Sequence, residues 1–189
     1  MNSETTPSSL DPEEQRVLLD LARQTIHARL RGLPLPEPRI DSPALRDVRG
    51  AFVTLKIDQR LRGCIGHVIG VVQLWRAVRD NAAAAAFEDP RFPPLTAEEL
   101  ESARIEISAL TPLQVSRPEG VIVGRHGILI ERGAARGLLL PQVAVENDWD
   151  RQIFLEQTCR KAGLETGCWR HPDTIISTFG AEVFGEEEP

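Results

Sequence analysis

The chain has 189 residues, with 22 Lys and Arg against 28 Asp and Glu and a net charge of -6. This length suits one domain, or a single domain with two lobes. No apolar run is long enough to span a membrane, and the N-terminus lacks the basic and apolar parts of a secretory signal. The acidic balance disfavours nucleic acid as the main partner. We therefore expect a cytoplasmic globular protein with no membrane attachment.

The N-terminal residues 1–10 are polar, and we expect this segment to be disordered. Asp11-Pro12-Glu13-Glu14 then combines an N-cap aspartate, a proline in the first turn and an acid three residues on. Apolar residues at helical spacing follow as far as Leu30, and Gly32 ends the pattern. The sequence thus predicts a first helix that starts at Asp11.

Residues 51–57 alternate as a strand does, and residues 58–60 turn the chain into a second strand near 61–65. After Gly70, a helix is predicted from the apolar stripe that includes Trp75, which we expect to be buried. The alternation at 104–110 is the clearest strand signal in the chain.

Short strands are predicted near 121–123, 128–131 and 137–140, followed by a helix over 150–162 and a final strand over 174–179. Residues 186–189 are expected to form a solvated acidic tail. Strands and helices are mixed without regular alternation. This favours an α+β fold with mixed or antiparallel sheets flanked by helices.

The cysteines are Cys64, Cys159 and Cys168, an odd number with no Cys-x-x-Cys pair. We therefore expect free thiols in a reducing compartment rather than a disulfide framework.

The hexapeptide Leu61-Arg62-Gly63-Cys64-Ile65-Gly66 resembles the signature of the AMME chromosomal region protein family, whose prokaryotic members are called AmmeMemoRadiSam system protein A. Further similar blocks follow in order at 87–95, 105–108, 137–144 and 149–164. The resemblance runs from about residue 13 to 185 and implies one family domain over 11–185. It implies a two-lobed fold with the hexapeptide near a cleft between the lobes. It also implies a link to a Memo-type protein and a radical S-adenosylmethionine enzyme, and it implies no particular reaction.

Cys64 is the candidate nucleophile, because glycines on either side allow close approach and Arg62 could stabilise a thiolate. Arg62 and Cys64 share a face if the strand is regular, whereas Cys64 and His67 point to opposite faces. The alternative is that Cys64 is a small core residue in a tightly packed strand.

A second hypothesis uses the backbone: Gly63, Gly66 and Gly70 precede a helix whose N-terminus could bind an anion together with Arg62 or Arg91. Asp89 and Glu106 are further ligand-binding candidates, although Asp89 could serve only to shape its loop.

Two Cys-x-x-His pairs, at 64–67 and 168–171, supply enough ligands for zinc, but they are too far apart for a compact zinc ribbon. We predict no metal site, and no motif indicates a cofactor.

These residues support two main hypotheses. The protein is either an enzyme, or an enzyme subunit, that acts on a small anionic or carbonyl substrate at Cys64 and Arg62, or a non-catalytic ligand-binding or adaptor protein. Nucleic-acid binding is a third and weaker hypothesis, because basic and aromatic residues are not interleaved.

Overall fold

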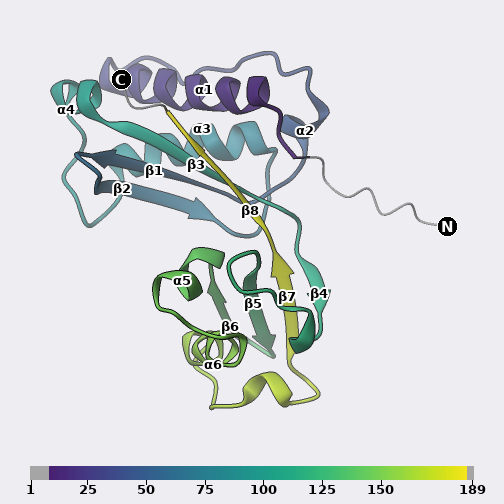
Figure 1. Ribbon diagram of the computed structural model, residues 1–189. Helices are drawn as coiled ribbons and strands as arrows, with labels where there is room; N and C mark the ends of the chain where they lie inside the picture. Colours follow the sequence, from purple (N-terminus) through teal and green to yellow (C-terminus); the bar gives the residue numbers. More distant parts are fainter. Residues whose placement is uncertain (1–8, 187–189) are drawn as a thin grey trace. The chain divides into compact units, whose positions relative to one another are not determined.

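A computed structural model describes residues 9–186 of the chain. Its internal contacts divide it into two compact units: unit 1 consists of Met1–Leu110 with Glu182–Pro189, and unit 2 of Thr111–Ala181. Each unit contains one four-stranded sheet and its own helices (Figure 1). The α+β class and the two lobes predicted from the sequence are therefore confirmed. The cleft expected between the lobes stays a prediction.

Unit 1 is built on a sheet with the strand order β2-β1-β3-β8. Its strands are β1 (Ala51–Ile57), β2 (Arg60–His67), β3 (Arg104–Leu110) and β8 (Ala181–Gly185). β1 pairs antiparallel with both β2 and β3. Alternate residues of β1 and β3 are fully buried, among them Val53, Leu55 and Ile107, because one face of the sheet packs against helices.

Two long helices, α1 (Pro12–Leu30) and α3 (Leu74–Phe87), cover this inner face of the sheet (Figure 1). α1 begins with the predicted capping box, in which Asp11 accepts the Glu14 N–H and the Glu14 side chain accepts the Asp11 N–H. Two short helices, α2 (Pro43–Arg46) and α4 (Ala97–Ser102), complete the unit. Trp75 is 5% exposed, so the prediction that it is buried is confirmed.

Unit 2 contains a sheet with the strand order β4-β7-β5-β6. Its strands are β4 (Gln114–Ser116), β5 (Gly127–Arg132), β6 (Ala135–Leu139) and β7 (Ile175–Phe179). The helices are α5 (Pro141–Glu146) and α6 (Arg151–Lys161), with 3-10 turns η1 (Pro118–Gly120) and η2 (Cys168–Arg170). The predicted helix over 150–162 is confirmed as α6, whereas the strand expected near 121–123 is wrong, since these residues are in no strand.

The prediction of three free thiols is also wrong, because Cys159 and Cys168 form a disulfide with a Cα–Cα distance of 5.9 Å. Both cysteines are buried in the core of unit 2. Cys159 lies on α6 and Cys168 on η2, and the turn between these two elements brings the sulfur atoms together. Cys64 is left as the free cysteine.

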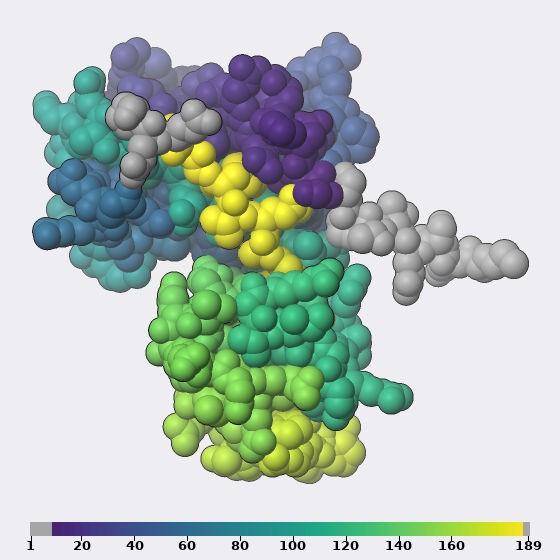
Figure 2. All heavy atoms as spheres, in the orientation of Figure 1, coloured from purple at the N-terminus to yellow at the C-terminus, as the bar shows by residue number. Residues whose placement is uncertain are grey.

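Both ends of the described chain are bound on the surface of unit 1. Figure 2 shows residues of the C-terminal strand, in yellow, beside those of α1, in purple. The Leu10 N–H donates to Glu182 at 2.8 Å, and Glu186 pairs with Arg23. The sequence predicted a disordered segment at 1–10 and a solvated tail at 186–189. For Leu10 and Glu186 this prediction is wrong, because both residues are bound to unit 1. Residues 1–8 and 187–189 of those segments lie outside the described part. Between residues 9 and 186, no helix is long and apolar enough to cross a membrane.

Candidate functional site

The outer face of the first sheet, turned away from α1 and α3, carries a row of polar side chains. In the register of the sheet, Cys64 on β2 lies opposite Thr54 on β1, which in turn lies opposite Glu106 on β3. The Thr54 hydroxyl donates to the Cys64 Sγ at 3.3 Å. Glu106 accepts from the Lys56 ammonium at 2.8 Å. The free thiol therefore sits at one end of a polar row that crosses three strands.

The loop after α3 binds the exposed edge of β2 at Cys64. The Cys64 N–H donates to Asp89 Oδ2 at 2.9 Å, and the Arg91 guanidinium donates to the Cys64 carbonyl at 3.1 Å. A backbone donor and acceptor that would otherwise be unpaired at a sheet edge are thus satisfied by side chains. This arrangement fixes the backbone on both sides of the thiol.

Asp89 and Arg91 also bind each other, with an Asp89 Oδ2 to Arg91 Nη2 distance of 2.7 Å. The Asp89 side chain is only 2% exposed. Its hydrogen bond from Arg91, together with the one from the Cys64 N–H, holds the pKa of this carboxyl far below its usual value. The pKa of Arg91 is raised, first by Asp89 and further by the neighbouring Cys64 thiol group. A buried carboxylate therefore positions an exposed guanidinium beside the thiol.

Arg62 is placed differently from the prediction. Leu55 pairs with Gly63 and Lys56 with Leu61, so Arg62 has no partner on β1 and forms a β-bulge. The strand is therefore irregular between Arg62 and Cys64, and the expected common face does not follow.

The buried Arg62 side chain instead pairs with Glu99 of α4, with Nε to Oε1 at 2.8 Å and Nη2 to Oε2 at 2.9 Å. Nη2 also donates to the Pro93 carbonyl at 3.0 Å. The hydrogen bond from Arg62 lowers the pKa of Glu99. Because Nε and Nη2 are occupied, Arg62 serves chiefly to attach α4 and its preceding loop to β2.

The glycines of the hexapeptide are explained by close packing. A Cβ on Gly63 would lie 2.1 Å from the Ala85 carbonyl oxygen of α3, and a Cβ on Gly66 would lie 2.4 Å from the Ala51 carbonyl oxygen. A Cβ on Gly70 would similarly meet the backbone of Arg49. These contacts let α3 and a neighbouring backbone approach the sheet closely, and they give no support to the anion-binding hypothesis.

His67 pairs with Ala51, whose side chain is on the inner face, whereas Cys64 pairs with Thr54 on the outer face. The two side chains therefore point to opposite faces, as the strand periodicity predicts. Cys168 is bound to Cys159 and has no thiolate to offer a metal. The two Cys-x-x-His pairs thus do not supply one common ligand set.

Two functional candidates were missed from the sequence, Thr54 and Glu99. Thr54 could have been found, since strand alternation and the predicted hairpin place it across from the second strand. Glu99 is the third residue of α4 and forms a capping box with Thr96. That motif identifies a helix start, but it does not reveal that the same carboxylate pairs with Arg62.

Comparisons with known proteins agree over almost the whole chain. The AMMECR1 family model matches residues 19–184. Protein TK0174 from Thermococcus kodakarensis is 45% identical over 184 residues, which cover 91% of this chain and 90% of that protein. Protein NEQ441 from Nanoarchaeum equitans is 42% identical over 178 residues, which cover 90% of this chain and 99% of that protein.

The crystal structure of the protein PH0010 from Pyrococcus horikoshii is similar with a TM-score of 0.78 and 41% sequence identity, over 92% of this chain and 91% of that one. The match covers both units and includes the hexapeptide at 61–66, whose resemblance pointed to the same family. The chain belongs to the AMMECR1 family.

Proposed function

We propose that the protein is an enzyme, or a subunit of one, that uses the Cys64 thiol as a nucleophile toward a small carbonyl substrate bearing an anionic group. The observation that carries this proposal is a hydroxyl donor at the thiol with a guanidinium beside it. The Thr54 hydroxyl donates to Sγ, and the Arg91 guanidinium is held beside it by a buried aspartate. Donors and cations of this kind stabilise a thiolate, which is the reactive form of cysteine.

In the proposed step, the thiolate adds to the carbonyl carbon and forms an S–C bond. The π bond of the carbonyl opens, its electron pair moves to the oxygen, and that oxygen takes a proton from water. Arg91 is the residue suited to hold the anionic group, because its side chain is 53% exposed and a guanidinium binds carboxylate or phosphate in a fixed geometry. Arg91 thus takes the role expected of Arg62.

The test uses the rate of Cys64 alkylation by iodoacetate, which is anionic, and by iodoacetamide, which is neutral. Because Cys159 and Cys168 are joined in a disulfide, the reference is Cys64 in the unfolded protein rather than the other two cysteines. We expect folded Cys64 to favour iodoacetate more strongly than the unfolded chain does. The preference should fall in Arg91→Gln and stay unchanged in Arg46→Gln, an exposed arginine outside the site.

If folded and unfolded protein show the same preference for iodoacetate over iodoacetamide, Arg91 does not belong to the site. Slower reaction of folded Cys64 with both reagents would favour a packing role for the thiol. To identify the substrate class, metabolites retained by the native protein should be compared between wild type and Cys64→Ala.

A second candidate function is that of an adaptor that docks a Memo-type protein and a radical S-adenosylmethionine enzyme. The observation that favours it is the exposure of three apolar side chains in one loop: Val71 at 79%, Ile69 at 40% and Val72 at 37%. The loop borders a cavity of about 190 Å³ in unit 1. Binding of either partner that is lost in Val71→Asp but kept in Cys64→Ala would favour the adaptor over the enzyme.

A further inference from the structure

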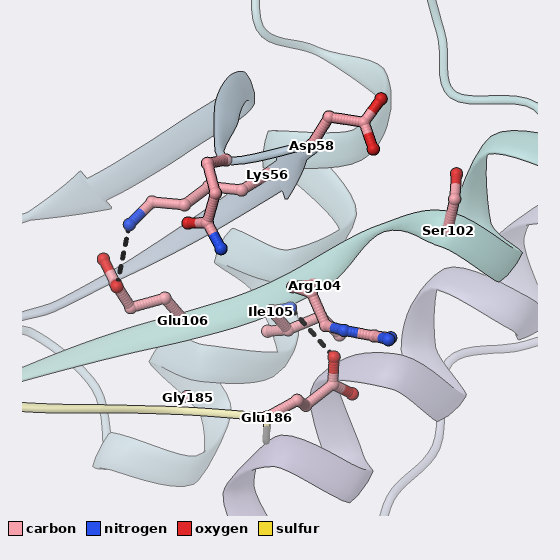
Figure 3. Close-up of a pocket in the computed structure, with 9 residues that line it drawn as sticks. Lys56, Asp58, Ser102, Arg104, Ile105, Glu106, Gly185 and Glu186 are labelled. Atoms are coloured by element: carbon pink, nitrogen blue, oxygen red, sulfur yellow. Dashed lines mark hydrogen bonds and ion pairs between the residues drawn. The ribbon is translucent and has the colours of Figure 1, made fainter. Parts of the chain in front are cut away.

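A second cavity in unit 1 lies away from the thiol, beside the hairpin that joins β1 to β2. It has a volume of about 540 Å³, which is within the range of small-molecule sites. Figure 3 shows Asp58 on the hairpin side, with Ser102 at the end of α4 and Arg104 at the start of β3. The end of β8 supplies the remaining wall through Gly185 and Glu186.

Most of the charges that line this cavity are already neutralised within the protein. The Lys56 ammonium pairs with Glu106 at 2.8 Å. Glu186 accepts the Ile105 N–H at 2.9 Å and pairs with Arg23. Such groups shape the wall, and a ligand gains little by competing for them.

Two opposite charges in the same cavity have no such partners. The Arg104 guanidinium and the Asp58 carboxylate make no hydrogen bond or ion pair with any residue between 9 and 186, and none with each other. Arg104 is half-buried on β3, whereas Asp58 is exposed on the hairpin. The cavity is thus lined by one positive group on β3 and one negative group on the hairpin.

The backbone holds Asp58 in an uncommon conformation. Asp58 has φ 49° and Gln59 has φ 61°, so both residues of the two-residue turn are in the left-handed region. This region costs a residue with a side chain roughly 1–2 kcal/mol, and glycine, asparagine or aspartate usually occupies it in such turns. The two-residue turn thus fixes the position of Asp58 among the residues that line the cavity.

We propose that this cavity binds a small zwitterion of the α-amino acid class. The carboxylate would receive two hydrogen bonds from the Arg104 guanidinium, and the ammonium would pair with Asp58. The lining contains two cations, Lys56 and Arg104, and three carboxylates, those of Asp58, Glu106 and Glu186, for a net charge of 2 - 3 = -1. That balance favours a zwitterion over a simple anion. The inference is independent of the chemistry of Cys64.

The experiment is calorimetric titration of the full-length protein with free L-amino acids, each compared with two derivatives of itself. The N-acetyl derivative lacks the ammonium, and the carboxamide derivative lacks the carboxylate. We expect at least one free amino acid to bind about tenfold or more tightly than either derivative, because each derivative removes one charge-assisted contact.

Variants assign each contact to its residue. Asp58→Asn should bind the free amino acid and its N-acetyl derivative equally, and it should fold well because asparagine tolerates the left-handed region. Arg104→Gln should bind the free amino acid and its carboxamide equally. If the glutamine variant fails to fold, Arg104→Lys, which keeps the charge but loses the planar guanidinium, should reduce the preference for the free amino acid over its carboxamide without abolishing it. The matched controls are Asp41→Asn and Arg39→Gln, which remove an exposed ion pair outside the cavity.

Three results would overturn the proposal. The first is that no amino acid binds, and the second is that N-acetyl derivatives bind as tightly as free amino acids, which would indicate a site for anions alone. The third is that both control variants weaken binding as much as the two cavity variants. Cys64 alkylation in Asp58→Asn should equal that of wild type, so failure here is distinguishable from failure of the thiol proposal.

Discussion

In unit 1 charged side chains bind the edge strand of the sheet. In unit 2, by contrast, a disulfide links the helix α6 to the 3-10 turn η2. Asp89 and Arg91 bind the edge of β2, and Arg62 joins that strand to α4 through Glu99. The buried core of unit 2 is the smaller of the two, and the Cys159–Cys168 disulfide is part of it. A disulfide stabilises such a unit mainly by constraining its unfolded chain.

This difference indicates which unit holds the candidate functional site. The catalytic and ligand-binding residues predicted from the sequence all lie in unit 1, where ionic contacts position the thiol and its neighbouring guanidinium. The cavity lined by Asp58 and Arg104 belongs to the same unit. Substitutions can test whether stability and site geometry depend on different residues in the two units.

The largest effect is expected from Trp75→Ala. Trp75 is buried in the core of unit 1 at the start of α3, and its indole N–H donates to Gln73 at 3.0 Å. Truncation of a large aromatic side chain in a core costs about 3–5 kcal/mol, a large share of the stability of a domain. We expect the variant to unfold or aggregate, as measured by circular dichroism and size-exclusion chromatography. A cooperative melt close to that of wild type would contradict the assigned core.

Arg62→Ala should come next, with a loss of about 3 kcal/mol in the free energy of unfolding, because it leaves Glu99 without its partner near a buried site. Urea denaturation measures this loss. Arg62→Met, which retains much of the apolar stem, should lose less than Arg62→Ala. If neither variant changes stability, the ion pair with Glu99 does not attach α4 to the sheet.

Reduction of the disulfide should destabilise unit 2 by about 2–3 kcal/mol, since the crosslink closes a short loop between residues separated by 9 positions. Hydrogen exchange with and without dithiothreitol resolves the two units. We expect faster exchange in β5 and α6 and unchanged exchange in β1 and β3. Uniform acceleration throughout the chain would mean that the two units unfold together.

Asp89→Asn should lower stability by about 2 kcal/mol at neutral pH, through loss of charge-assisted hydrogen bonds. The pKa of Asp89 is lowered in the folded protein. Its ionised form therefore stabilises the fold above the unfolded pKa of about 4, and that contribution is lost as the pH falls further toward the folded pKa. Urea melts at several pH values should show the difference between wild type and variant shrinking below about pH 4. A constant difference, or one equal to that of Asp41→Asn, would contradict this role.

Local signals in the sequence were sufficient for much of the fold. The capping box at Asp11, the alternation at 104–110 and the apolar stripe through Trp75 each depend on neighbours in the chain, and each prediction is confirmed. β8 (Ala181–Gly185) was missed because its alternation is weak and its place in the sheet depends on pairing with β3.

The site was less predictable for the same reason. The bulge at Arg62 is a property of the β1–β2 register, and the pairing of Arg62 with Glu99 joins residues 37 positions apart. The disulfide depends on the turn that brings η2 back to α6. Residue type and spacing identified Cys64, Asp89 and Arg91 as candidates, but only the fold shows which of them positions the others.

The smallest effect is expected from Cys64→Ala. The thiol is half-buried on the outer face, and its Sγ accepts the 3.3 Å hydrogen bond from Thr54. The contacts of Asp89 and Arg91 use the backbone of residue 64 and survive the substitution. We therefore expect a loss below about 1 kcal/mol, with a thermal melt close to that of wild type. A melt as damaged as that of Trp75→Ala would mean that the cysteine is needed for packing, and the proposal that it acts as a nucleophile would lose its main support.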